Sequence, residues 1–281
     1  MIRIITDSTA DISLELAEKL NIEVVPLKVI FNQEIYDDGV DLKTDEFYQK
    51  LVAAEQLPTT SQPSPEAFLK IFEDVKEKND EAIVILLSSK ISGTVQSAMI
   101  AKDMAEYDGI HVIDSLNATI GLSLLVDVAI KLREQGLLAK EIVDRITNYI
   151  PKTKIIAVVD TLEYFVKGGR LSKTAGMAGK MLNLKPVVTL VDGTLEVISK
   201  ARGLKKSYRW INNYILETYQ IDLSLPIYYG YTGEPLQFDN FISTMHGGLN
   251  IEKAPYEKRL IGCVIGTHAG PGAMAIAFIT E

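Results

Sequence analysis

The spacing of hydrophobic and polar residues divides the first half of the chain into alternating strand-like and helix-like stretches. Strand-like apolar runs lie at 3–6, 82–87 and 110–113, and residues 21–31 are rich in β-branched side chains. Strands that alternate with helices are typical of a parallel sheet covered by helices. Apolar residues at helical spacing predict helices over 14–20, 44–52, 66–79, 95–107 and 118–135.

The pattern changes beyond Pro151. Strand-like runs at 155–159, 186–190 and 195–198 come first, and the last two flank the turn sequence VDGT (191–194), which is a good hairpin signal. Because no flexible linker separates the two patterns, we expect a parallel α/β domain over 1–155 packed closely against a mixed α+β domain over 156–281. The rest of this second half predicts helices over 204–219 and 238–245 and strands over 227–230, 260–265 and 273–279.

Composition restricts the function. A chain of 281 residues with 47% hydrophobic and 23% charged residues can build a core without disulfides, and its single cysteine excludes an intramolecular one. A net charge of -8 disfavours binding to nucleic acid, which needs a basic face. The start of the chain has no signal-peptide pattern, and its most apolar long window, 260–279, is interrupted by histidine, proline and glycines. We therefore expect a cytoplasmic protein without a transmembrane segment.

Motifs of cofactor-dependent enzymes are incomplete. The GPGAMA stretch (270–275) imitates a dinucleotide loop but has no following strand to carry the ribose-binding acid, and GMAGKM (176–181) has methionine where a phosphate loop needs Ser or Thr. The acidic stretch 36–46 does not fill the ligand positions of a calcium loop, so a solvated turn is expected there. His111 and His246 are interpreted as a structural and a loop residue, and with no zinc signature we expect no cofactor and no metal.

Three loops rich in hydroxyl residues follow strands or open helices. They are TDSTAD (6–11), TTSQPSP (59–65) and SSKISGT (88–94). In open parallel sheets, ligands bind at the carboxyl ends of strands, where helix N-termini offer unpaired N–H groups. Helix capping is the simpler role for TDSTAD. The third loop has more hydroxyls than one cap requires, so capping and anion binding both remain open for it.

His268 lies in a further loop, GTHAGPGA (266–273), directly after the apolar run 260–265. Three glycines and a proline surround this histidine, whereas a structural histidine in a core is usually satisfied by backbone groups. A core role and a ligand contact are the two interpretations of His268.

The quoted motifs, together with GGRLS (168–172) and LKPVV (184–188), occur in the same order as in the DegV family. The chain therefore resembles these bacterial fatty-acid-binding proteins, also called FakB, over essentially its whole length. The resemblance implies two domains with a long-chain fatty acid buried between them. It also implies that Thr60 and Ser92 hold the carboxylate with His268 nearby, that the glycines let the backbone come close, and that Ser61, Gly93 and Thr94 complete the head-group loops.

The resemblance also implies a partner. In the family, a separate ATP-dependent fatty acid kinase phosphorylates the bound fatty acid, and the acyl-phosphate enters phospholipid synthesis; Arg170 would serve docking or phosphate transfer from an exposed turn. Candidate walls for the acyl chain are 118–130 and 177–184. Two alternatives stay open: a hydrolase or transferase with Ser92 or Ser8 as nucleophile and His268 as base, and a sensor of a small polar ligand.

Overall fold

The computed structural model describes residues 1–172, 174 and 184–281. Its first sheet is parallel throughout. The strand order is β2-β1-β6-β7, as the alternating pattern predicts. Its two faces bury different side chains, because neighbouring residues on a strand point in opposite directions. The strands are β1 (Ile2–Asp7), β2 (Ile22–Val25), β6 (Glu81–Leu86) and β7 (Ile110–Asp114).

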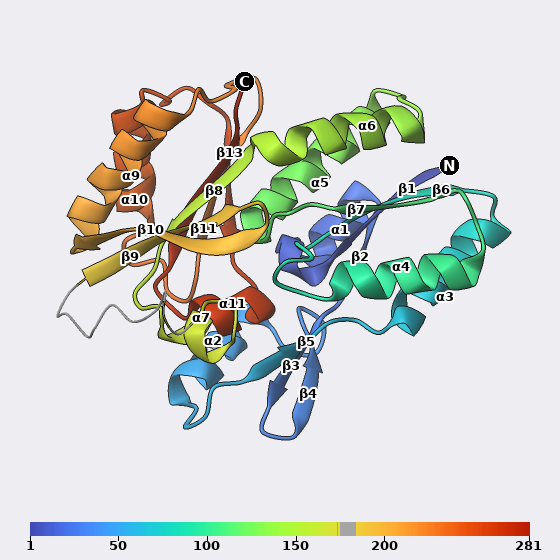
Figure 1. The fold of residues 1–281 in the computed structure, drawn as a ribbon, viewed down its shortest axis with the longest axis horizontal. Coiled ribbons are helices and arrows are strands. Elements are labelled where there is room, and N and C mark those ends of the chain that lie inside the picture. Colours follow the sequence, from blue (N-terminus) through green and yellow to red (C-terminus); the bar gives the residue numbers. More distant parts are fainter. Residues whose placement is uncertain (173, 175–183) are drawn as a thin grey trace.

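Helices cover both faces of this sheet (Figure 1). On one face Ile5 and Val84 pack with Phe68 and Phe72, and on the other Ile4 and its neighbours join the cluster that contains α5. The 3-10 turn η1 (Ser8–Ala10) follows β1, and its cap is Asp7, as capping by TDSTAD requires. The helices are α1 (Leu14–Leu20), α3 (Pro65–Glu77), α4 (Thr94–Ala105), α5 (Thr119–Glu134) and α6 (Ala139–Tyr149).

A small antiparallel sheet interrupts the first pattern. The β-branched stretch 21–31 bends at Pro26, so β2 and β3 (Lys28–Phe31) belong to different sheets; proline cannot continue a strand ladder. The order of the small sheet is β4-β3-β5. Its other strands are β4 (Glu34–Asp37) and β5 (Thr59–Ser61), with α2 (Thr44–Ala53) between them in sequence.

The second sheet is mixed, which confirms the expected α+β pattern. Its order is β10-β9-β8-β13-β11-β12, and only β11 and β12 pair in parallel. The predicted hairpin joins β9 and β10, with Asp192 and Gly193 both at positive φ. The strands are β8 (Thr153–Val158), β9 (Leu184–Val191), β10 (Thr194–Arg202), β11 (Ile227–Tyr231), β12 (Tyr256–Leu260) and β13 (Met274–Ile279).

The two faces of this sheet have different partners (Figure 1). Helices α9 (Leu204–Thr218) and α10 (Phe238–Leu249) cover one face, and α5 contacts β8, β11 and β13 on the other. Helix α5 also contacts β1 and β6, so it lies between the two sheets and packs against both. The division of the chain near residue 155 stays a prediction, although β8 opens the second sheet at Thr153.

Three expectations are wrong. The run 260–265 is not a strand: β12 ends at Leu260, and Cys263–Ala269 forms the short helix α11, because a brief apolar run fits either structure. His246 lies in α10, packed against two tyrosine rings, and not in a loop. The acidic turn is not fully solvated, since Asp38 is only 5% exposed.

No helix in the described part of the chain is long and apolar enough to span a bilayer.

Candidate functional site

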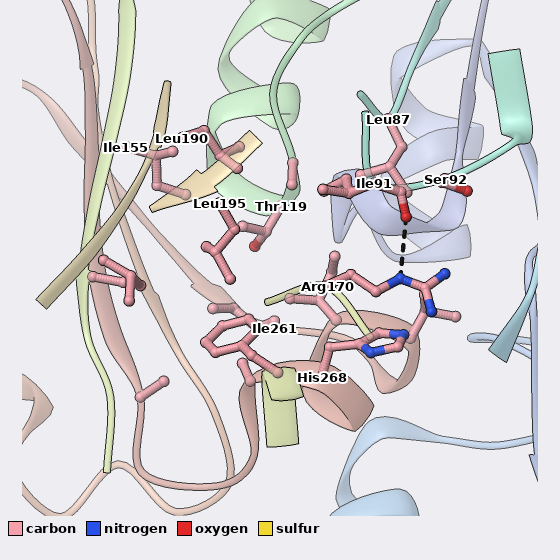
Figure 2. Close-up of a pocket in the computed structure, with 18 of the residues that line it drawn as sticks. Leu87, Ile91, Ser92, Thr119, Ile155, Arg170, Leu190, Leu195, Ile261 and His268 are labelled. Atoms are coloured by element: carbon pink, nitrogen blue, oxygen red, sulfur yellow. Dashed lines mark hydrogen bonds between the residues drawn. The ribbon is translucent and has the colours of Figure 1, made fainter. Parts of the chain in front are cut away.

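A cavity of about 430 Å³ lies between the two halves of the fold. Apolar side chains from both halves make most of its wall. Most of its polar side chains gather toward one side, whereas Thr119 lies between the two ends and the Thr189 hydroxyl donates to the Ile155 carbonyl. Figure 2 shows Ser92, Arg170 and His268 on that side and Ile155 and Leu190 on the opposite one. The expected wall 118–130 contributes Ala118 and Thr119, and the other expected wall, 177–184, falls outside the described residues except for Leu184.

Thr60 and His268 meet at the polar end of the cavity. Thr60 comes from β5 and His268 from α11, and the Thr60 Oγ1 atom lies 2.8 Å from the His268 Nε2 atom. Gly168 leaves room for the imidazole, because a Cβ atom there would lie 2.1 Å from His268 Nδ1. Two residues 208 positions apart in the chain therefore form one hydrogen-bonded pair.

The protonation state of His268 follows from its burial. The side chain is 8% exposed, and desolvation, with a smaller contribution from the Arg170 charge, lowers its pKa to about 4. The imidazole is therefore neutral near pH 7. We assign its proton to Nε2, because the buried Nδ1 has no partner among the described residues and a buried N–H without a partner is rare. Thr60 Oγ1 then accepts from His268, and its own hydrogen is free to donate to a ligand.

Ser92 supplies a second hydroxyl to the cavity. Its Oγ atom lies 2.9 Å from Thr94 Oγ1, at the start of α4. Ser61 also lines the cavity, whereas Gly93 and Thr94 lie behind Ser92: Thr94 is fully buried, and the side chain of Gln62 packs against Gly93. The roles predicted for these residues with a carboxylate stay predictions.

Arg170 is half-buried, although Lys167 and Gly169 of the same turn are exposed as expected. Its Nε atom donates to the Ile91 carbonyl at 3.1 Å, and its Nη1 atom donates to the Gly168 carbonyl at 2.7 Å. Burial lowers the pKa of the guanidinium from its ordinary value. Arg170 thus bridges the loop before α4 and the turn after α7 (Glu163–Lys167), at the polar end of the cavity (Figure 2).

Two carboxyl groups, that of the buried Asp38 and that of the partly exposed Asp11, position α11 and hence His268. The Asp11 carboxylate accepts from the Gly262 N–H at 2.8 Å, and the Asp38 carboxylate accepts from the Cys263 N–H at 3.1 Å. The first N–H groups of a helix have no partner within the helix, so the two carboxyl groups supply one for each of these. Asp11 also accepts from the hydroxyl of Thr119, a residue of the cavity wall.

Asp11 is expected to make stability depend on pH. Burial is the main cause that raises the pKa of Asp11 to about 8, so its carboxyl loses its proton less readily in the folded chain than in the unfolded chain. Its contribution to stability is therefore lost as pH rises toward about 8. The buried His268, with its pKa lowered to about 4, acts in the opposite direction, but only below its ordinary pKa of 6.5. Above that pH the neighbouring Asp38, whose pKa burial also raises, acts in the same direction as Asp11.

Asp11→Asn should reduce the fall in melting temperature between about pH 6.5 and 8, because an amide does not titrate there, whereas Asp38 still does. The measurement is thermal unfolding across this range. Asp103→Asn, at an exposed position of α4, is the matched control and should follow the wild type. A wild-type-like decline in Asp11→Asn would contradict the assignment.

The nucleophile and base expected for a hydrolase are not paired. Ser8 is buried and its Oγ accepts from the Leu27 N–H at 3.0 Å, while Ser92 pairs with Thr94. The hydroxyl that contacts His268 is that of Thr60. Within the described ranges, no cluster of three or more His, Cys, Asp and Glu side chains could hold a metal ion.

The glycines around His268 serve packing of protein side chains. A Cβ atom on Gly266 would lie 2.5 Å from the Tyr48 hydroxyl, and one on Gly270, whose φ is +71°, would lie 2.3 Å from the Tyr164 ring. Gly266 and Gly270 therefore let α11 approach two tyrosines, and the expectation that the glycines of this loop let the backbone come close to a carboxylate stays a prediction.

Sequence reasoning placed Thr119 in a candidate wall but missed its conformation and its bond to Asp11. This wall residue has φ +48°, which is rare for a β-branched side chain, and its hydrogen bond to Asp11 compensates part of the strain. Nothing in the residue order around Thr119 signals such a conformation. Gln62 is another wall residue that was not predicted. It lies inside the TTSQPSP motif, so the motif could have identified it.

Comparisons with known proteins agree over the full length. The family model described as "Uncharacterised protein, DegV family" matches residues 1–281. A DegV domain-containing protein of Caldanaerobacter subterraneus subsp. tengcongensis is 40% identical over 279 residues, which are 99% of this chain and 98% of the relative.

Solved structures share the fold. A DegV family protein from Thermus thermophilus, described for fatty acid binding, is 30% identical with a TM-score of 0.87, and the match covers 100% of this chain and 99% of that one. The Fatty Acid Kinase (Fak) B3 protein of Streptococcus pneumoniae, loaded with linoleic acid, is 26% identical with a TM-score of 0.86 and full coverage of both chains.

Proposed function

The chain belongs to the DegV family, and we propose that it binds a long-chain fatty acid in the cavity and presents the carboxylate to a separate ATP-dependent kinase. The observation that carries the proposal is the distribution of polar groups: six of the eight polar side chains in a mostly apolar wall lie at one end, and the Thr189 hydroxyl is already bonded to the Ile155 carbonyl. A fatty acid has the same distribution. Burial of the acyl chain contributes about 0.8 kcal/mol per CH₂ group, and the hydroxyls fix its orientation.

The polar end suits a carboxylate. Thr60 and Ser92 can each donate a hydroxyl hydrogen, and the Arg170 guanidinium lies at the same end. A carboxylate without such donors would cost several kcal/mol to bury. In the kinase step a carboxylate oxygen attacks the γ-phosphorus of ATP, the bond to ADP breaks, and the products are acyl-phosphate and ADP. The fatty-acid-kinase name of one structural relative and the absence of an ATP motif from this sequence support this partner.

Mass spectrometry of lipid extracted from the purified protein tests the proposal. We expect a near-stoichiometric long-chain fatty acid, because an apolar cavity of about 430 Å³ left without a ligand would be unfavourable. A protein that carries no fatty acid and does not retain added stearic acid would overturn the proposal. If that protein also cleaves acyl esters, the hydrolase is the better explanation.

A further inference from the structure

The second sheet presents two unlike faces. On β8, Ile156 and Val158 are fully buried in the cluster that contains α9 and α10, while Ile155 and Ala157 line the cavity. On β13, the fully buried Ile276 faces α9 and α10, and its neighbour Ala275 lines the cavity. The face toward the helices therefore carries large side chains, and the cavity face carries alanine at two of its positions.

These alanines form a continuous row across the sheet. Val188 of β9 pairs with Ala157, Ala157 pairs with Ala275, and Ala275 pairs with Gly230 of β11. Directly paired residues of antiparallel strands lie on the same face, with Cβ atoms about 4.5–5.5 Å apart. Side-chain volume thus falls along the row from Val188 to Gly230.

Protein side chains fill this row except above Ala157: Val188 and Ala275 are only 3% and 2% exposed. A Cβ atom on Gly230 would lie 3.0 Å from Ile120 and 3.1 Å from Ile261, so these two isoleucines occupy the space above the glycine. Above Ala157 the space belongs to the cavity: Ala157 keeps partial exposure, although its neighbours Ile156 and Val158 have none. Because protein interiors contain few voids, we interpret this unfilled space above Ala157 as the place of a bound ligand.

Ile155 closes the cavity in the other direction. It lies two residues before Ala157 on the same face of β8, about 6.6 Å along the strand. Figure 2 shows Ile155 beside Leu190, at the end of the cavity away from Ser92 and His268. An acyl chain whose carboxylate lies at the polar end would therefore pass over Ala157 and stop at Ile155.

We propose that Ala157 determines the width available to the acyl chain and that Ile155 determines the chain length that fits. The proposal rests on the proposed function and adds the residues that select the substrate. It assigns to this cavity a preference for long, unbranched acyl chains. Each buried methylene changes affinity by about fourfold, so small changes in cavity volume should alter the preferred chain length measurably.

Ala157→Leu tests the width. The added carbons can only occupy the cavity, so we expect stearic acid to bind at least about tenfold more weakly and lauric acid to be affected much less. Affinities for lauric, palmitic, stearic and arachidic acid are measured by displacement of a fluorescent fatty acid. Ala201→Leu, the same change on β10 at a position that does not line the cavity, is the matched control and should keep the wild-type order.

Ile155→Ala tests the length in the opposite direction. Removing side-chain carbons from the end wall should raise the affinity for arachidic acid relative to palmitic acid by about fourfold or more. This variant decides the proposal even if Ala157→Leu fails to fold. An unchanged chain-length order in Ile155→Ala would overturn it, and so would an unchanged stearic acid affinity in folded Ala157→Leu.

The wild type separates this inference from the function on which it rests. A wild-type protein that binds none of the four acids overturns both. A wild type that binds them, with variants that bind them in the same order and with the same strength, overturns only the assignment of Ala157 and Ile155.

Discussion

Replacing Arg170 with alanine is expected to leave fatty acid bound and to slow acyl-phosphate formation by about ten- to a hundredfold. The guanidinium lies at the polar end of the cavity, and an arginine fork suits a phosphate in transfer better than a single ammonium group does. The measurement is phosphorylation of the loaded protein by the cognate kinase with ATP. Arg170→Lys should recover only part of the rate, because it keeps the charge without the planar fork.

A small loss of stability should accompany this change. Arg170 donates to the Ile91 carbonyl across the cavity, and loss of this bond should cost about 1 kcal/mol, read from thermal unfolding. Arg145→Ala, at an exposed position of α6, is the control and should change neither rate nor loading. Phosphorylation of Arg170→Ala at the wild-type rate would exclude a role in transfer or docking. Loss of bound lipid would instead make Arg170 a carboxylate ligand.

Thr60→Val is expected to weaken fatty acid binding by about ten- to a hundredfold. Valine has nearly the shape of threonine but removes the hydroxyl, which deprives the carboxylate of a donor and leaves the buried Nε2–H of His268 without its acceptor. Affinity for palmitic acid, measured by isothermal titration calorimetry, tests this. Ser92→Ala should have a separate effect of similar direction, and Ser89→Ala, exposed on the same loop, should have none.

A double-mutant cycle distinguishes a direct role of His268 from an indirect one. If His268 acts by orienting Thr60, then His268→Ala should cost much less affinity in the Thr60→Val background than in the wild type, since contacting residues are not additive. Ser92→Ala and His268→Ala should be closer to additive. Full additivity of Thr60→Val and His268→Ala would show that the histidine contacts the ligand independently.

The parts of the fold that follow local rules were predictable. Hydrophobic spacing predicts the parallel sheet of β1, β2, β6 and β7, because burial on both faces requires continuous apolar strands between amphipathic helices. The VDGT turn predicts the β9–β10 hairpin, because the Asp-Gly pair tolerates the positive φ that Asp192 and Gly193 adopt.

Helix α11 shows where local rules fail. Its seven residues are too few to be stable alone, and its first N–H groups are bonded by Asp11 and Asp38, which are 251 and 225 residues away in the chain. The strand expected at 260–265 was wrong for this reason: the groups that favour the helix are distant in sequence. Asp38 is buried for the same reason, because the helix that it caps is distant in sequence.

The motifs by themselves identified the candidate site residues, because Thr60, Ser92, Arg170 and His268 all lie in these motifs and all line one cavity. Only the tertiary structure decided how they meet: that Thr60, and neither serine, contacts His268, and that Arg170 is half-buried. It also decided the cavity itself, because an alanine in an apolar strand reads the same whether a neighbouring side chain or a ligand fills the space above it. Sequence spacing records which face a residue occupies, whereas the distance between two faces depends on how the whole chain packs.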